Sequence, residues 1–232
     1  DAKYLEEYWQ GLNVTGPVAS SGRWTPVQGE PEMSMDELSS QAKYLRQKIK
    51  NQVKRNGVDK HTKTLWKDSV AETQMGYCVG PFFDDDKVAE FVGSPDWIPT
   101  MRFGVEQKGK TRGIDTAKSN KVNRATRPSE KMSLHTTDFN MGCIRKIVKK
   151  QHNFQFKKRG RRTGRLAAWV LDERKAYRQI PVSPEQRKYS VVCLMDPVSK
   201  KIGYFVMIGH SFGLVSAVFN YNRRAAIVTE IL

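Results

Sequence analysis

One acidic side chain lies at a place where it could hold a metal ion. Asp172 directly follows an apolar run at 166–171, and that run is typical of a buried strand. A carboxylate at a strand end can bind a divalent cation, but two-metal phosphoryl transfer needs carboxylates from more than one strand. A second acidic cluster, at 84–86, is typical instead of the first turn of a helix. Asp172 is therefore the candidate metal ligand, and the alternative is that it caps the turn that follows it.

The most charged stretch of the sequence lies just before Asp172, at 145–165. It holds ten bases and no acid, and aromatic residues are interleaved with the bases. Such a stretch repels itself unless a polyanion neutralises it, and exposed aromatic rings can stack on nucleic-acid bases. We therefore predict RNA binding here, and the alternative is a solvated, disordered loop. The predicted RNA-binding residues are Arg145, Lys146, Lys149, Lys150, Phe154, Phe156, Lys157, Lys158, Arg159, Arg161, Arg162 and Arg165.

The charge of the whole chain favours the same partner. The 232 residues carry a formal net charge of +16, although residues 1–39 contain seven acids against two bases. The body of the chain, 40–232, therefore carries +21, the difference between +16 and −5. A protein this basic attracts polyanions and releases counterions when it binds phosphates. No apolar run is long enough to cross a membrane, so we expect RNA as the partner and no membrane.

Cysteine usage and the first residue bear on the compartment. Cys78, Cys143 and Cys193 are far apart and odd in number, which argues against a disulfide framework and against a zinc site of the CxxC type. This pattern favours a reducing compartment. The first residue is Asp and not Met, so we expect a processed chain or part of a precursor. Import into a mitochondrion is compatible with such processing, and it is the location that we predict.

Three segments must position the candidate residues, and together they predict an α+β fold. Residues 1–33 are rich in Gly, Pro and Ser, which predicts an extended N-terminal arm. Residues 34–96 are predicted to form a basic helical region. Residues 97–232 alternate between strand-like and helical patterns and carry Asp172.

The clearest helix is predicted at 34–57, and it is amphipathic and basic. Ser34 and Glu37 form a capping box, and Gly57 suits the C-terminal end of the helix. The opposite face is rich in Lys and Arg, and it is either solvated or turned toward phosphates. The apolar face is formed by Leu38, Ala42, Leu45, Ile49 and Val53.

Two hairpins are predicted in the C-terminal segment. Strand-like residues 102–107 meet a turn at 108–110 and return at 111–115, and the turn places lysines at the tip. Two further β-rich runs, 188–195 and 202–208, are joined by a second turn. A helix is predicted to follow, with one face formed by Val218, Tyr221, Ala225 and Val228.

Three pieces of this segment together resemble a reverse transcriptase, an RNA-directed DNA polymerase, of the type found in protist retroelements. "WIPTMRFGVEQKGKTRGID" (97–115) resembles the fingers motif, and "LDERKAYRQIPVSPEQRKYSVV" (171–192) resembles the first catalytic motif of the palm. "SFGLVSAVFNYNR" (211–223) is similar to the next palm motif. The pieces follow one another in family order, and the resemblance covers 97–232. It implies the fingers and the first part of the palm, with the N-terminal arm and the basic helix added.

The resemblance also implies roles for individual residues. Lys108 or Lys110, together with Arg112, would clasp the triphosphate of the incoming nucleotide. In the palm, the first acid would bind the catalytic Mg²⁺ ions, the tyrosine would pack under the sugar and screen for the 2′-hydroxyl, and the Phe-Gly loop would lie against the template and the nascent pair. These palm residues are Asp172, Tyr177, Gln179, Phe212 and Gly213.

The sequence also departs from the family pattern. Gly113 stands where the family often has Pro, and Thr116 stands where it often has a second Asp. No aromatic-x-Asp-Asp hairpin follows the Phe-Gly motif, and the thumb is missing. We therefore predict a non-catalytic, reverse-transcriptase-derived RNA-binding scaffold in a ribonucleoprotein such as a mitochondrial ribosome. Ribosomal RNA and neighbouring proteins would be its partners, it would need no cofactor, and its polymerase residues would be relics. The alternative is the N-terminal part of an active RNA-directed DNA polymerase that uses Mg²⁺ in two-metal phosphoryl transfer.

Overall fold

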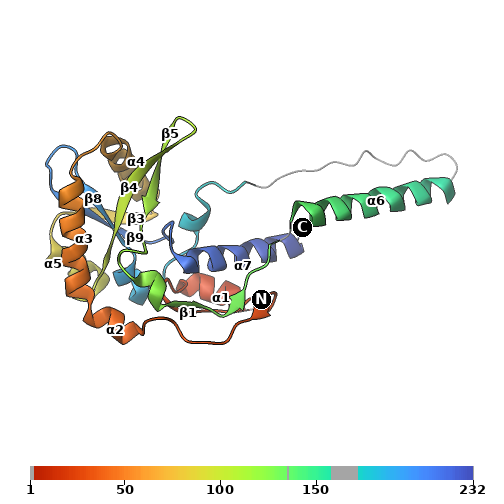
Figure 1. Cartoon of the computed structure of the whole chain (residues 1–232), viewed down its shortest axis with the longest axis horizontal. Coiled ribbons are helices and arrows are strands. Elements are labelled where there is room, and N and C mark those ends of the chain that lie inside the picture. Colours follow the sequence, from red (N-terminus) through yellow and green to blue (C-terminus); the bar gives the residue numbers. More distant parts are fainter. Residues whose placement is uncertain (1–2, 135, 158–171, 232) are drawn as a thin grey trace. The chain divides into compact units, whose positions relative to one another are not determined.

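The computed structural model confirms a mixed α+β protein (Figure 1). It describes residues 3–134, 136–157 and 172–231. The chain divides into two compact units, one made of Asp1–Lys131 with Lys175–Leu232 and the other of Met132–Arg174. No helix in the described ranges combines the length and the apolar character that a membrane crossing requires.

The first unit is built on a mixed sheet of five strands. Its strands, in their order across the sheet, are β3 (Cys78–Phe82), β9 (Ile202–Met207), β8 (Val191–Met195), β4 (Pro99–Gln107) and β5 (Lys110–Asp115). β4 and β8 run parallel, and the other neighbours are antiparallel. Every residue of β8 and β9 is buried, because helices cover both faces of the sheet there. Both predicted hairpins are confirmed.

Three helices cover this sheet: α3 (Ala42–Asn56), α4 (Thr62–Gln74) and α5 (Asp85–Val92). Successive side chains of a strand point to opposite faces, so β8 shows which helix lies on which side. Val191 and Cys193 pack in one apolar cluster with α3 and α5, whereas Val192 and Leu194 pack in another cluster with α4. The sheet is therefore the middle layer, with α3 and α5 on one face and α4 on the other.

The helix predicted at 34–57 is present but interrupted. It consists of α2 (Met35–Ser40) and α3, and Gln41 separates the two. Ser34 caps α2 by accepting a hydrogen bond from the Glu37 N–H at 3.0 Å, and Gly57 follows the end of α3, as predicted. All members of the predicted apolar face are buried: Leu38, Ala42, Leu45, Ile49 and Val53.

The acidic cluster at 84–86 begins α5, as the sequence predicted. The Asp84 side chain accepts a hydrogen bond from the Asp86 N–H at 2.7 Å, so it is the N-terminal cap. The Asp85 carboxylate forms an ion pair with Lys50 of α3 at 2.9 Å. These acids therefore stabilise a helix start and join two helices of one layer.

The predicted extended arm, 1–33, contains a helix that the sequence reasoning missed. The elements of this region and its partners are α1 (Lys3–Gln10), β1 (Gly16–Val18), β2 (Thr25–Pro26), β6 (Thr126–Pro128) and β7 (Glu130–Lys131). β1 pairs with β6 in parallel, and β2 pairs with β7 in antiparallel orientation. Leu12 and Val14 are buried, so this part of the chain belongs to the core of the first unit.

The remaining elements complete both units. In the first unit they are three 3₁₀ helices and one α-helix: η1 (Val122–Ala125), η2 (Ala176–Gln179), η3 (Pro184–Tyr189) and α7 (Val215–Ile231). α7 is the predicted C-terminal helix, and it lies beside α1 (Figure 1). The second unit contains α6 (Thr137–Lys157), which covers part of the predicted basic stretch. The predicted strand at 166–171 lies outside the described residues.

Candidate anion-binding site

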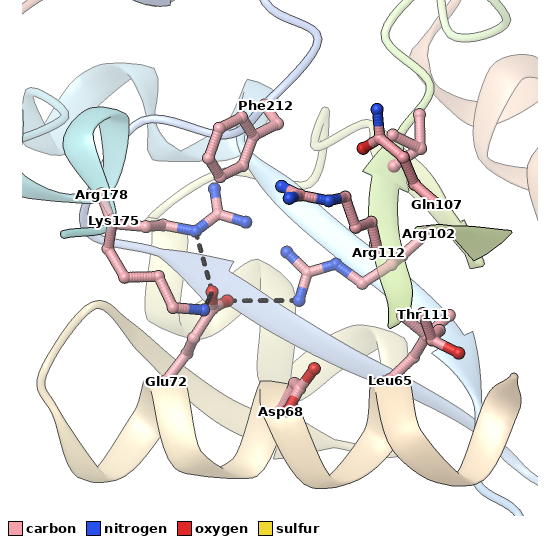
Figure 2. A pocket seen from close by; sticks show the side chains of 12 residues that line it. Leu65, Asp68, Glu72, Arg102, Gln107, Thr111, Arg112, Lys175, Arg178 and Phe212 are labelled. Atoms are coloured by element: carbon pink, nitrogen blue, oxygen red, sulfur yellow. Dashed lines mark hydrogen bonds and ion pairs between the residues drawn. The ribbon is translucent and has the colours of Figure 1, made fainter. Parts of the chain in front are cut away.

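A pocket of about 530 Å³ lies where α4, the β4–β5 hairpin, η2 and the loop before α7 meet (Figure 2). We call it the basic pocket, because four of its side chains are cations and their charged ends converge on one space. It is lined by Leu65, Asp68, Glu72, Arg102, Gln107, Thr111, Arg112, Gly113, Ile114, Lys175, Arg178 and Phe212.

A buried carboxylate, Asp115, anchors two of the guanidinium groups. It is 2% exposed, and it accepts two hydrogen bonds from Arg102, at 2.7 and 3.1 Å. Arg178 donates a third, at 3.1 Å. Burial alone would raise the pKa of Asp115, but the two guanidinium groups outweigh it and hold that pKa below its ordinary value. Asp115 is therefore ionised at neutral pH, and it fixes two arginines from different elements.

A second carboxylate, Glu72 of α4, binds the same arginines and a lysine. It accepts from Arg102 at 3.2 Å, from Arg178 at 3.2 Å and from the Lys175 Nζ at 3.0 Å. Burial would raise the pKa of Glu72, but Arg178 and Arg102 overcome that effect and lower it. The two acids and three cations form one network that joins α4, β4, β5 and η2.

The lining retains a surplus of positive charge. Asp68 and Glu72 of the lining, together with Asp115, which is buried and not part of the lining, supply three negative charges, and the four cations of the lining supply four. Arg112 is exposed, and its side chain forms no hydrogen bond or ion pair with any residue that the structure describes. The side chain of Lys175 is 32% exposed, in contrast to the buried arginines of the network. Arg112 and Lys175 are therefore the cations that can meet an anion from solvent.

An aromatic ring closes one side of the basic pocket. Phe212 is 37% exposed, and the guanidinium carbon of Arg178 lies 5.2 Å from its ring centroid. Tyr177 packs against Phe212, with 5.1 Å between the ring centroids, and against Tyr221 of α7, with 5.5 Å. Phe212 is thus held from behind while part of its ring remains open, which is the arrangement that lets a planar group stack.

The glycine after Phe212 lets this loop approach the ion network closely. Gly213 has φ of +91°, and a Cβ at this position would collide with the carbonyl oxygen of Asp115. Only glycine adopts this conformation without strain and leaves room for that oxygen. The close approach to Asp115 therefore requires glycine at the second position of the Phe-Gly pair.

The structure brings some of the predicted polymerase residues of the first unit together, and Gln179 has other partners. Arg112 and Phe212 line the basic pocket, and Tyr177 lies behind Phe212. The side chain of Gln179 instead accepts a hydrogen bond from Arg224 of α7, at 3.2 Å. Asp172 is exposed and belongs to the second unit.

The two lysines predicted beside Arg112 are not part of the pocket lining. Lys108 occupies the turn between β4 and β5 with φ of +51°, and Lys110 begins β5. Both are exposed. The sequence could not separate them from Arg112, because side-chain direction in a short hairpin depends on register and twist.

Sequence reasoning missed the ion network itself, whose members are Glu72, Arg102, Asp115, Lys175 and Arg178. One signal was available. The predicted turn at 108–110 places Arg102 opposite Asp115 across the hairpin, and opposite charges at such positions attract. The contributions from α4 and η2 are distant in sequence and gave no comparable signal.

The acids of the basic pocket do not suit the two Mg²⁺ ions that the resemblance implies. Glu72 and Asp115 are already bound by guanidinium and ammonium groups. Within 3–134, 136–157 and 172–231, no three His, Cys, Asp or Glu side chains are grouped so that they could hold a metal ion. We therefore derive no metal-dependent step from this pocket.

The predicted RNA-binding stretch lies only partly within the described residues. Arg145, Lys146, Lys149 and Lys150 are exposed on α6. The side chains of Phe154, Phe156 and Lys157 lie outside the described ones, as do the residues Lys158, Arg159, Arg161, Arg162 and Arg165.

Comparison with known proteins gave no relative: no family model, no curated protein and no solved structure matches the chain.

Proposed function

We propose that the basic pocket binds the phosphate groups of a nucleotide, and that the chain forms the fingers and part of the palm of a protein of the reverse-transcriptase type. One observation carries this proposal. Arg112, Arg178 and Phe212, which come from three separate segments, face the same pocket (Figure 2). Phosphate needs cations, and a nucleobase needs an aromatic surface; the pocket offers both.

The ion network prepares the pocket for a phosphate. Asp115 and Glu72 hold the buried guanidinium groups of Arg102 and Arg178 in fixed positions, so these two charges line the pocket without reorganising when an anion binds. Direct contact with the phosphate falls to Arg112 and Lys175, which solvent reaches. The guanidinium group of Arg112 matches a phosphate in shape and can donate two parallel hydrogen bonds to it.

The sequence motifs support the same assignment. In the family that the sequence resembles, the arginine of the fingers motif clasps the triphosphate, and the Phe-Gly loop lies against the template and nascent pair. Arg112 and Phe212 occupy these motif positions, and both line the basic pocket. The assembled pocket therefore favours nucleotide binding, which the polymerase alternative requires, over the purely structural role of an RNA-binding scaffold.

The test is nucleotide affinity in two variants of the β4–β5 hairpin. Arg112→Gln removes a cation that lines the pocket, whereas Lys110→Gln removes one from the same strand outside the lining. We expect R112Q to weaken binding of a fluorescent deoxynucleoside triphosphate about 10- to 100-fold, the effect of losing hydrogen bonds to a charged group. K110Q should change the affinity less than about threefold, because Lys110 lies outside the lining and a solvated charge that does not contact the ligand contributes little. Equal losses in both variants would contradict the proposal and indicate non-specific attraction.

A second candidate function is an RNA-binding scaffold in a ribonucleoprotein, and α6 favours it. Arg145, Lys146, Lys149 and Lys150 are all exposed, and none forms an ion pair within the described part of the chain. Sedimentation of the native protein from its own cells, with and without ribonuclease, tests this candidate. Migration with a large particle that ribonuclease collapses supports the scaffold; slow migration in both samples contradicts it.

A further inference from the structure

Helix α3 has an unusual charge composition. Its 15 residues, "AKYLRQKIKNQVKRN", contain six bases and no acid. Two of these bases, Arg46 and Lys50, form ion pairs with the single carboxylate of Asp85 in α5, at 3.9 and 2.9 Å. The other four form no ion pair within the residues that the structure describes: Lys43, Lys48, Lys54 and Arg55.

The outer surface of α3 carries a regular stripe of polar side chains. Tyr44, Lys48, Asn51 and Arg55 follow one another at spacings of four, three and four residues, so they lie along one line of the helix. We call these four residues the α3 stripe. All are exposed, and Tyr44 is 64% exposed. The buried face of the helix lies on the other side, against the sheet.

A shallow hollow of about 480 Å³ follows the α3 stripe. It is lined by Tyr44, Gln47, Lys48, Asn51, Gln52 and Arg55. The lining therefore combines two cations, three side-chain amides and one phenol. About 10 Å separates the Lys48 and Arg55 positions along the helix axis, because each residue adds about 1.5 Å.

The α3 stripe and the basic pocket are on different sides of the sheet. α3 covers the same face as α5, whereas the basic pocket is lined by α4, which covers the opposite face. The sheet therefore lies between the α3 stripe and a nucleotide in the basic pocket, and the stripe is a separate site.

The charge pattern of α3 indicates what this partner is. A solvated helix face usually mixes acids with bases, because opposite charges three or four residues apart stabilise a helix and like charges destabilise it. α3 lacks acids altogether, and four of its six bases have no ion-pair partner among the described residues. A polyanion would neutralise these charges and release counterions. Exposed bases next to an exposed aromatic ring are typical of surfaces that bind single-stranded nucleic acid.

We propose that the α3 stripe is a second nucleic-acid contact, which binds the backbone of a single strand. Lys48 and Arg55 neutralise phosphates, Asn51 hydrogen-bonds to the backbone or a base edge between them, and Tyr44 stacks on an unpaired base. This inference goes beyond the nucleotide pocket, and it holds whether or not that pocket binds a nucleotide. The shared ligand chemistry is a phosphodiester strand, either RNA or DNA.

The test compares two double variants in a titration of a short, fluorescein-labelled single-stranded RNA by anisotropy. Lys48→Gln with Arg55→Gln removes two charges from the α3 stripe. Lys200→Gln with Lys201→Gln removes two exposed charges beside the β8–β9 turn and is the matched control. We expect the stripe variant to lower the slope of log affinity against log salt by about 1.4, since each phosphate contact on a single strand contributes about 0.7. The control should leave the slope unchanged; equal slopes for the two variants would overturn the proposal.

Three further measurements fix the class of partner. Tyr44→Ala should weaken RNA binding about tenfold or more without changing the salt slope, because stacking releases no counterions. The same oligonucleotide as DNA separates the two sources of a phosphodiester strand: equal affinity assigns the contact to the backbone, and a preference for RNA assigns it to RNA. If polyglutamate binds as tightly as RNA and loses the same affinity in the stripe variant, the proposal of a nucleic-acid partner is overturned.

A control separates this proposal from the proposed function of the basic pocket. The affinity of the basic pocket for a nucleotide, measured in the stripe variant, should equal that of the unchanged protein. A failed test of the α3 stripe can therefore be told apart from a failed test of the pocket.

Discussion

Arg178 donates a hydrogen bond of 3.1 Å to the carboxylate of Asp115, which lies 63 residues earlier in the chain. This contact joins η2 to the end of the β4–β5 hairpin. Arg102, which faces Asp115 across the hairpin, shares the same carboxylate. Two segments that lie far apart in the sequence are thus fixed to each other by one buried acid.

Asp115→Asn should destabilise the protein strongly. The neutral amide leaves the buried guanidinium groups of Arg102 and Arg178 without their main counter-charge, and breaking a buried ion pair from one side costs about 3–5 kcal/mol. Urea unfolding measures this loss. Asp68→Asn removes an exposed acid from the same pocket and should change the free energy of unfolding by less than about 0.5 kcal/mol. Similar stabilities of D115N and D68N would show that the network does not hold the unit together.

His210 should make stability depend on pH between about 4 and 6.5. Burial lowers the pKa of His210 to about 4, and the ring is held neutral: its Nδ1 donates to the Ile180 carbonyl at 3.0 Å, and its Nε2 accepts from the Asn220 amide at 3.0 Å. The unfolded chain binds this proton near pH 6.5, so the folded state binds fewer protons in between. The stability that this group contributes is therefore complete above pH 6.5 and falls as the pH drops toward 4.

The size of this effect follows from the shift in pKa. Each pH unit of the window costs about 1.4 kcal/mol, and the whole window costs about 3 kcal/mol. Urea midpoints measured from pH 6.5 down to 5 isolate His210, because the lowered carboxylate pKa values of Asp115 and Glu72 matter only at lower pH. His210→Gln should flatten the dependence in this range. An equally steep dependence in H210Q would assign it to another group.

Sequence reasoning predicted the elements whose causes are local. The cap at Ser34, the cap at Asp84 and the turn of the β4–β5 hairpin depend on residues within a few positions of each other, and all were predicted. The buried face of α3 was predicted because helical spacing is visible in the sequence. The break at Gln41 was missed, since the apolar spacing continues through it.

Features that depend on distant residues were not predictable in the same way. α1 is stabilised by contacts of Tyr4 with Leu12 and Ile180. Ile180 is distant in the sequence, so no local pattern predicts these contacts. The basic pocket combines four segments, and the sequence identified Arg112 and Phe212 only through a motif resemblance. The charges of Glu72, Lys175 and Arg178 look like ordinary surface charges in the sequence. Their burial follows from the packing of α4 and η2 against the sheet.

Gly213→Ala should destabilise the first unit and move Phe212. Alanine at φ of +91° is strained, and its Cβ would collide with the carbonyl oxygen of Asp115, so we expect a loss of at least about 2 kcal/mol. Gly93→Ala is the matched control, because Gly93 also has positive φ, +67°, but open space around its Cβ position. It should cost about 1 kcal/mol from backbone strain alone. Thermal unfolding of both variants measures the difference, and equal losses would mean that the contact with Asp115 is not close.

Phe212→Ala should separate the contribution of the base from that of the phosphates. If the Phe212 ring stacks on a nucleobase, its removal costs about 1–3 kcal/mol in affinity for a deoxynucleoside triphosphate, which is about 5- to 150-fold. Inorganic triphosphate has no base, so its affinity should stay the same. Phe91→Ala removes a similarly exposed ring from α5, 40% against 37%, on the other face of the sheet, and it should affect neither ligand. Calorimetric titration of both ligands into the three proteins gives the comparison. A parallel loss for nucleotide and triphosphate in F212A would show that the ring shapes the phosphate site through Arg178, which lies 5.2 Å from its centroid, and does not contact the base.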